Sequence, residues 1–236
     1  MSSNSTIFTG KKALLLDMNG TFMFGQDRFG VSEDFSLHYS AHGGQLTRST
    51  INRLVRNIYE YLSEKYPDEL YRHDFPSVEQ ALASVSDETY EDEETQRIVD
   101  TFAYHEFGEV PLAYVEALGT LSQRFVLGAV IDIWSPKAAW LDTFERSGIG
   151  SLFDAISFSS DHGMVKPSPK PFDLVLGQLN ITNLEAIVVG DSSRRDLGGA
   201  KNAGIDCILV GGAVHRDALD HFSNLVELSE QIRLRK

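Results

Sequence analysis

Short apolar runs separated by helical patterns recur along this chain. Five such runs are expected to form strands, at residues 13–16, 125–131, 155–159, 186–189 and 207–210. Helical patterns lie between the later runs, over residues 136–147, 169–179 and 196–203. Strands that alternate with helices are typical of βαβ units, in which helices cover both faces of a parallel sheet. The pattern therefore predicts an α/β fold with a mostly parallel sheet.

Between the first and second expected strands the pattern is different, because this stretch is rich in charges and has no convincing strand. Apolar residues recur at spacings of three and four over residues 51–62, as on one face of an amphipathic helix. A short helix is expected to start near Ser77, and a longer one covers residues 93–107. We therefore predict an all-helical domain at 25–110, inserted into a core formed by residues 1–24 and 111–236.

Composition narrows the class of protein. The formal net charge of −13 argues against a nucleic-acid or anionic membrane partner, since both require a basic face. No window reaches the roughly 18 apolar residues of a membrane span, and residues 1–12 lack the apolar stretch of a secretory signal. The single cysteine, Cys207, lies in an apolar run and is expected to be a buried structural thiol. We expect a cytoplasmic protein, either a monomer or a homodimer.

The first expected strand ends at a carboxylate, Asp17, and a Gly-Thr turn follows at once. In an open α/β sheet, reactive groups collect at the carboxyl ends of the strands. A carboxylate held there is a candidate nucleophile, metal ligand, or both. Thr21, in the turn, is a candidate substrate contact. Asn19, two residues beyond Asp17, is an amide and cannot titrate as an acid/base partner.

Further polar groups follow the later strands. The run GDSSRRD follows the strand at 186–189 and contains two carboxylates, Asp191 and Asp196. A hard divalent ion such as Mg²⁺ binds a few carboxylates and several waters, which suits Asp17 together with Asp191. Lys166 precedes the first of two closely spaced prolines, so a stiff segment presents it. Beside a carboxylate cluster, this lysine is expected to hold Asp17 ionised and to neutralise a bound anion.

Three of these segments resemble motifs of the haloacid dehalogenase-like hydrolase superfamily. They are the run DMNGT at 17–21, Lys166 with its proline, and GDSSRRD at 190–196. Their order and spacing extend over nearly the whole chain, and the helical insertion stands where the superfamily has a cap domain. The resemblance implies a Rossmann-like core that performs hydrolysis through an aspartyl-enzyme intermediate.

The resemblance also implies a role for each motif residue. Asp17 would attack phosphorus, or carbon in the dehalogenating branch of the superfamily. Mg²⁺ would be held by Asp17, Asp191 and the backbone carbonyl of Asn19, with Asp196 supporting the metal site. Lys166 would stabilise the phosphoryl oxygens of a small phosphorylated metabolite. Positioning and charge neutralisation are also what phosphoryl transfer requires on physical grounds.

The sequence departs from the superfamily pattern at two positions. Phosphatases of the superfamily usually have a second Asp where this chain has Asn19, and that Asp acts as the general acid/base, a role worth about 10²- to 10⁴-fold in rate. They also usually have Ser or Thr at the end of the second strand, where this chain places Ile131. Ser135, nearby, is a conceivable substitute for that hydroxyl.

Three explanations of Asn19 remain open. In the first, the chain is a phosphatase for substrates with good leaving groups. In the second, Asp132 at the tip of the second strand acts as a displaced proton carrier; the alternative for this residue is an ordinary turn position. The third explanation is that phosphatase activity is lost, which leaves a 2-haloacid dehalogenase or a phosphoryl-binding protein with little turnover. The two carboxylates of the run at 190–196 favour a metal site, whereas dehalogenating members do without Mg²⁺. Phosphonate cleavage would need a cap lysine, and Lys65 lies in an ordinary charged helix end.

Overall fold

The computed structural model describes residues 7–234. A six-stranded sheet lies at its centre, in the order β3-β2-β1-β4-β5-β6 with every neighbouring pair parallel. The strands are β1 (Ala13–Leu16), β2 (Val126–Ile131), β3 (Ala155–Phe158), β4 (Ala186–Gly190), β5 (Asp206–Leu209) and β6 (Asp220–His221). The first half of the stretch 1–12, for which no secretory signal is expected, lies outside the described residues.

Strand β1 occupies the position where the order of the strands reverses. Leu16 pairs with Ala129 of β2 on one side and with Val189 of β4 on the other. After β1 the chain builds the sheet towards β3, and then it crosses back to add β4 on the opposite side of β1. Connections leave the sheet in opposite directions at such a point, which is where ligands commonly bind in open α/β sheets.

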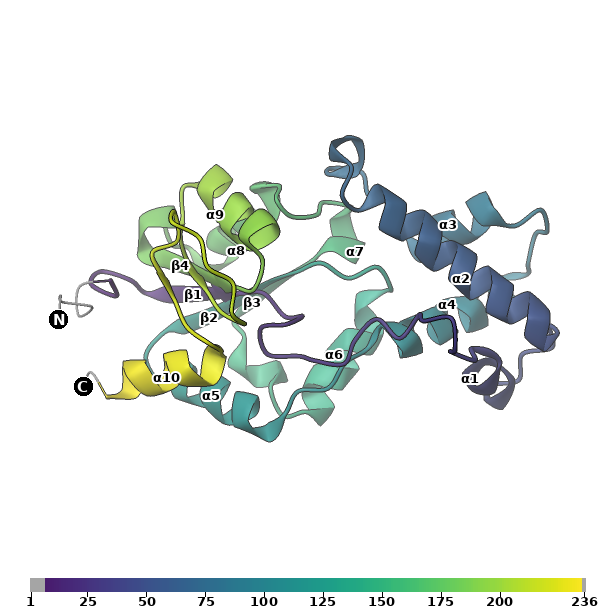
Figure 1. The fold of residues 1–236 in the computed structure, drawn as a ribbon, viewed down its shortest axis with the longest axis horizontal. Coiled ribbons are helices and arrows are strands. Elements are labelled where there is room, and N and C mark those ends of the chain that lie inside the picture. Colours follow the sequence, from purple (N-terminus) through teal and green to yellow (C-terminus); the bar gives the residue numbers. More distant parts are fainter. Residues whose placement is uncertain (1–6, 235–236) are drawn as a thin grey trace.

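Helices cover both faces of the sheet, as the apolar runs predicted (Figure 1). Leu14 and Leu16 point into one hydrophobic cluster, and Leu15 points into another on the opposite face, as the alternation of a strand requires. The first cluster also includes residues of α5 (Leu112–Ser122), α6 (Lys137–Arg146) and α10 (Leu225–Arg233). The second includes residues of α8 (Lys170–Leu179) and α9 (Gly198–Ala203). The Rossmann-like α/β fold expected from the sequence is confirmed.

Five α-helices lie between β1 and β2 in the sequence, and four of them fall within residues 25–110; we call these four the inserted helices. They are α1 (Ser36–Ala41), α2 (Arg48–Lys65), α3 (Val78–Val85) and α4 (Asp92–Glu106). The apolar residues of α2 at spacings of three and four pack with α3 and α4 in a cluster separate from the two at the sheet. Thr47 and Ser77 cap α2 and α3 by accepting backbone N–H bonds, so the local sequence defines both starts.

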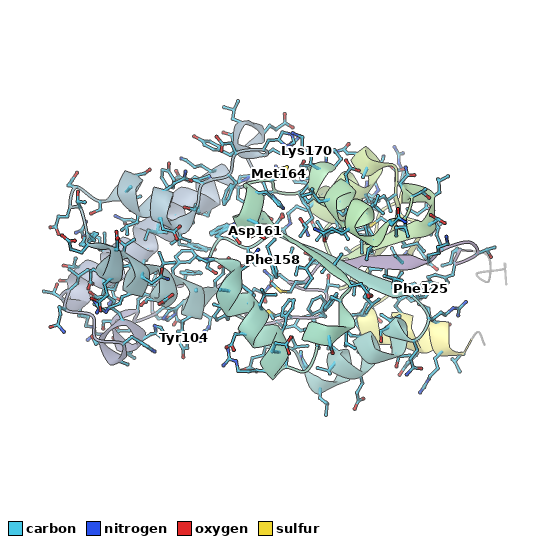
Figure 2. All side chains as sticks on the ribbon, turned by 180° about the vertical axis from the view of Figure 1, so that it is seen from behind. Tyr104, Phe125, Phe158, Asp161, Met164 and Lys170 are labelled. Atoms are coloured by element: carbon cyan, nitrogen blue, oxygen red, sulfur yellow. The ribbon has the colours of Figure 1, made fainter. Side chains whose placement is uncertain are left out.

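The inserted helices lie beyond the carboxyl ends of the strands. Figure 2 shows Phe125, just before β2, at the far end of the sheet, and Phe158, the last residue of β3, near the junction with the inserted helices. The short helix α7 (Ser159–His162) follows β3 at this junction. Any group at the carboxyl ends of the strands therefore lies between the sheet and the inserted helices.

Several elements were absent from the expected pattern. These are α1, α5, α7, α10, β6 and a π-helical turn over Ser193–Leu197, together with 3₁₀ turns at Glu69–Tyr71, Gly150–Leu152 and Asn183–Glu185. Strand β6 has only two residues, Asp220 and His221, so no alternation of apolar and polar positions marks it. Within residues 7–234, no helix is long and apolar enough to cross a membrane.

Gly128 of β2 should be required by the packing of α8 on the sheet. A Cβ added to Gly128 would lie 2.6 Å from Cγ1 of Val175 and 2.9 Å from Cδ2 of Leu15. We expect Gly128→Ala to lower the free energy of unfolding in urea by about 1–3 kcal/mol through overpacking. As a control, Gly119→Ala in α5 meets no atom within 4 Å and should raise stability by about 0.5–1 kcal/mol. A Gly128→Ala protein as stable as the parent would contradict this account.

Candidate active site

Asp17 lies immediately after β1, at the carboxyl ends of the paired strands β1 and β4. Its backbone N–H donates to the carbonyl of Val189 at 2.9 Å, which continues the pairing of the two strands by one residue. The residue is 7% exposed, and Thr21 donates its hydroxyl to Oδ2 at 3.4 Å. Burial, followed by the negative charge of Asp196, raises the pKa of Asp17 to about 7, and Lys166 opposes the rise.

The buried amine of Lys166 joins two of the predicted site residues. Its Nζ donates to Oδ1 of Asp17 at 2.5 Å and to Oδ1 of Asp196 at 2.7 Å. Lys166 is only 3% exposed. Burial works against the charged amine, but the carboxylates of Asp17 and Asp196 hold the pKa of Lys166 above its ordinary value. The lysine is therefore a fixed positive charge beside the candidate nucleophile.

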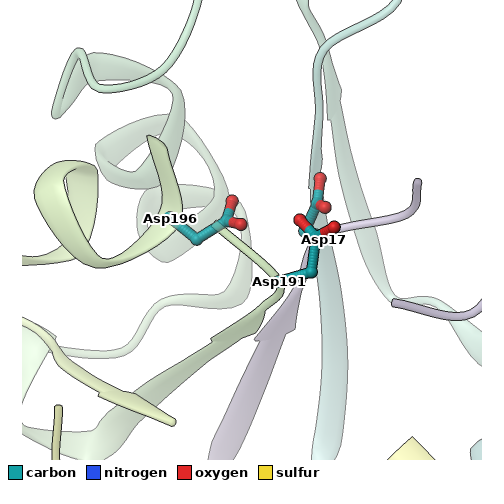
Figure 3. Close-up of side chains that lie close together, drawn as sticks. All are labelled: Asp17, Asp191 and Asp196. Carbon is teal, nitrogen blue, oxygen red and sulfur yellow. The ribbon is translucent and has the colours of Figure 1, made fainter. Parts of the chain in front are cut away.

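Asp191 and Asp196 come from the turn that follows β4. Figure 3 shows Asp17 and Asp191 next to each other, with Asp196 pointing towards them from the following turn. Gly20 makes this approach possible, because its φ is +76° and a Cβ there would lie 2.1 Å from Oδ2 of Asp191. Burial, and then the charge of Asp196, raise the pKa of Asp191.

The three carboxylates fit a small divalent cation. One oxygen of each of Asp17, Asp191 and Asp196 lies within 4.8 Å of the others. Oδ1 of Asp191 and Oδ1 of Asn19 are buried without a hydrogen-bond donor, at a cost of about 1–3 kcal/mol each that a cation would offset. A donor set of oxygen atoms alone suits a hard ion such as Mg²⁺. Asp196 already accepts from Lys166 and from the backbone N–H of Ser192, so it supports the cluster.

Asp132 follows β2 and contacts the site from the other side of Lys166. Its Oδ2 accepts the hydroxyl of Tyr66 at 2.6 Å and the backbone N–H of Lys166 at 3.0 Å. No hydrogen bond joins Asp132 to Asp17. Ile131, which was assigned to the hydroxyl position, is 1% exposed and packs into the core. Asp132, the first residue after β2, and not Ile131 thus contributes the polar group at this edge of the sheet.

Ser135 is not brought to the candidate nucleophile. Its side chain is fully buried, and its hydroxyl accepts the indole N–H of Trp140 at 2.8 Å. The backbone N–H groups of Trp134 and Ser135 donate to the carboxylate of Glu106, the last residue of α4, at 2.7 and 2.9 Å. Burial raises the pKa of Glu106 to about 7. Glu106 thus clamps an inserted helix to the segment after β2, and Ser135 belongs to that clamp.

Tyr66, Glu106 and Arg195 are site residues that the motifs did not single out. Tyr66 follows α2 directly, and the guanidinium of Arg195 lies over its ring, 5.4 Å from the centroid. Glu106 was detectable as a carboxylate near the apolar face of the helix predicted at 93–107. Arg195 was detectable as a cation between the two carboxylates of the run at 190–196. Tyr66 had no sequence signal, since an aromatic residue at a helix end usually packs without further function.

Comparison with known proteins identifies the family. A model of the family described as haloacid dehalogenase-like hydrolase matches residues 45–210, more than half of the 236-residue chain. The matched region contains Lys166, Asp191 and Asp196. The chain therefore belongs to the haloacid dehalogenase-like hydrolases.

Curated relatives match parts of the chain. The pyrophosphatase PpaX of Halalkalibacterium halodurans is 40% identical over 67 residues, which cover 28% of this chain and 31% of that protein. The glyceraldehyde 3-phosphate phosphatase of Pyrococcus furiosus is 32% identical over 100 residues, which cover 42% of this chain and 41% of that protein. The chain thus spans less than half of the length of these relatives.

Solved structures match the fold over nearly the whole chain. The magnesium-bound HAD-hydrolase YfnB of Bacillus subtilis has a TM-score of 0.60 at 18% identity, and the match covers 94% of this chain and 98% of that one. A 2-haloacid dehalogenase of Pseudomonas syringae has a TM-score of 0.63 at 19% identity, with 96% and 100% covered. At this level of identity, the similarity concerns the fold alone.

The Glu106 clamp should make stability depend on pH. The folded protein keeps the proton on Glu106 up to about pH 7, whereas an unfolded chain loses it near pH 4.5. Stability should therefore fall by up to about 3 kcal/mol as the pH rises through this window. We expect Glu106→Gln to flatten this part of the profile of melting temperature against pH. The exposed Glu79→Gln serves as control, and an unchanged profile in Glu106→Gln would refute the assignment.

Proposed function

We propose that this chain is a Mg²⁺-dependent phosphatase that acts on a small phosphorylated metabolite through an aspartyl-phosphate on Asp17. One arrangement carries the proposal: Asp17 is held by the buried amine of Lys166, while the unpaired oxygens of Asp191 and Asn19 face no donor. A nucleophile, a fixed cation and a cation site are the parts that phosphoryl transfer requires.

In this proposal Asp17, Asp191 and the backbone carbonyl of Asn19 hold Mg²⁺, and Asp196 orients the cluster through Lys166 and Ser192. When bound, the ion would neutralise charge on the phosphoryl oxygens. A carboxylate oxygen of Asp17 attacks phosphorus as the bond to the leaving oxygen breaks. Lys166 stabilises the negative charge of the phosphoryl group. Water then cleaves the acyl phosphate, which releases inorganic phosphate and restores the carboxylate.

Proton delivery to the leaving oxygen is the step that Asn19 cannot perform. Two possibilities follow from the site. The leaving group departs without a proton, as acyl and enol phosphates allow, or Asp132 delivers it. Burial raises the pKa of Asp132, which favours a proton-carrying form, although Lys166 and Tyr66 oppose the rise. The role of Asp132 stays a prediction.

A 2-haloacid dehalogenase is the second candidate, because halide leaves as an anion and needs no acid at position 19. The unpaired buried oxygen of Asp191 favours the metal-dependent reaction instead. A phosphoryl-binding protein with little turnover would keep the same site. We further propose that residues 25–110 form the cap domain and that the protein works in the cytoplasm. The free, buried thiol of Cys207 supports that location.

Hydrolysis of p-nitrophenyl phosphate should require both Mg²⁺ and Asp17. We expect Asp17→Asn to lower kcat by about 10³-fold or more, because the amide is no nucleophile. Chelation of Mg²⁺ should have a similar effect on the parent protein. The exposed Asp142→Asn, in α6, should keep full activity. Halide release without metal would support the dehalogenase instead, and hydrolysis that persists in Asp17→Asn would refute the proposed nucleophile.

The missing acid at position 19 should limit substrates with poor leaving groups. We expect Asn19→Asp to raise kcat for alkyl phosphates by about 10- to 100-fold. The kcat for p-nitrophenyl phosphate should change little, because its leaving group needs no proton. No gain would mean that position 19 does not limit the reaction.

The same pair of substrates tests Asp132. If it is the displaced proton carrier, Asp132→Asn should abolish turnover of alkyl phosphates and spare p-nitrophenyl phosphate. Tyr66→Phe is the matched control, because it removes the hydrogen bond to Asp132 and keeps the carboxylate. Unchanged alkyl phosphate activity in Asp132→Asn would exclude the role.

A further inference from the structure

A small cavity lies between the end of α2 and the turn after β4. Its volume is about 150 Å³, and it is lined by Tyr66, Pro67, Lys166, Ser192, Arg194 and Arg195. The first two residues belong to the segment after an inserted helix, and the others belong to the core. Pockets for drug-sized ligands measure roughly 300–1,000 Å³, so this one suits a single small group. Because Lys166 also donates to Asp17, the cavity adjoins the candidate nucleophile.

The lining of this cavity is cationic. It contains three basic side chains and no carboxylate. Lys166 is already paired with two carboxylates, and Arg194 donates to the carbonyl of Pro67 at 2.6 Å. The guanidinium of Arg195 forms no hydrogen bond or ion pair with any residue in 7–234, and it lies over the ring of Tyr66. Burial works against its charge, and the carboxylates of Asp17, Asp196 and Asp132 are close enough to raise its pKa, but none of them pairs with it directly. A half-buried guanidinium that lacks a direct ion pair leaves its N–H donors open to an anionic ligand.

The walls of the cavity are held in place on both sides. Tyr66 is anchored by its hydrogen bond to Asp132, and Pro67 is anchored by Arg194. In the π-helical turn, the backbone N–H of Arg195 donates to Oγ of Ser192 at 3.1 Å. A preorganised guanidinium loses little conformational freedom when it binds a planar anion.

We propose that this cavity binds a carboxylate of the substrate, so that Arg195 is a specificity-determining residue and the substrate is a small phosphorylated carboxylic acid. The proposal rests on the proposed phosphatase function, because it places the phosphoryl group at Asp17. A carboxylate is favoured over a second phosphoryl group because one unpaired guanidinium matches a single negative charge.

Equilibrium binding tests this proposal without turnover. The Mg²⁺-loaded parent protein is titrated calorimetrically with phosphonoacetate and 3-phosphonopropionate, which present a carboxylate at two distances from the phosphonate. Methylphosphonate and ethylphosphonate are the matched ligands without it. We expect at least one carboxylated ligand to bind about 10- to 100-fold more tightly than its match. Arg195→Gln should abolish this advantage and leave the Kd of the simple phosphonates within about threefold.

The exposed Arg53→Gln, in α2, is the control for loss of a positive charge. This variant should bind the carboxylated ligands as much more tightly than their matches as the parent does. The proposal is overturned if the parent shows no carboxylate advantage at either length. It is also overturned if Arg195→Gln weakens both kinds of ligand equally, because Arg195 would then serve the phosphoryl group. An Arg195-dependent advantage in a protein without phosphatase activity would support the cavity and refute only the proposed reaction. Phosphatase activity in a protein that shows no preference for carboxylated ligands would refute only the proposed carboxylate site.

Discussion

A buried lysine holds the active end of this molecule together. Lys166 lies in the segment after β3, and its amine bonds both Asp17 after β1 and Asp196 after β4. Buried charges are costly unless they are paired and hydrogen-bonded, and several carboxylates gather at this edge of the sheet. The ammonium group offsets part of their repulsion. A single cation therefore ties together the segments that follow three strands, β1, β3 and β4.

The contacts between the inserted helices and the core depend on the same edge. Tyr66 donates to Asp132, whose carboxylate also accepts the backbone N–H of Lys166. Glu106 accepts two backbone N–H groups from the segment after β2. Any movement of the inserted helices away from the sheet would break these buried hydrogen bonds. Access to Asp17 and the packing of the inserted helices are thus coupled.

A carboxylate at position 19 would combine two functions, cation binding and proton transfer, and Asn19 can serve only the first. Its backbone carbonyl and its unpaired Oδ1 still offer oxygen atoms to a cation. Its amide cannot donate or accept a proton in a reaction. The site consequently keeps a candidate nucleophile, a fixed cation and a set of oxygen ligands. In the proposed reaction the proton has to come from elsewhere, so the leaving group would decide the activity.

Local patterns in the sequence determined the strands of the sheet and the residues at their ends. Strand and helix periodicity span a few residues each, so β1 to β5 were predictable, and Asp17 and Asp191 followed as strand-end carboxylates. A two-residue strand such as β6 has too little pattern to be detected. Only the tertiary structure decided that Asp132 is turned to Tyr66, that Glu106 clamps the segment after β2, and that Arg195 lies over an aromatic ring. The partners in the first of these contacts are 66 residues apart in the chain, and those in the second are 28 apart. No local periodicity encodes such pairings, because they arise only when the inserted helices pack against the carboxyl ends of the strands.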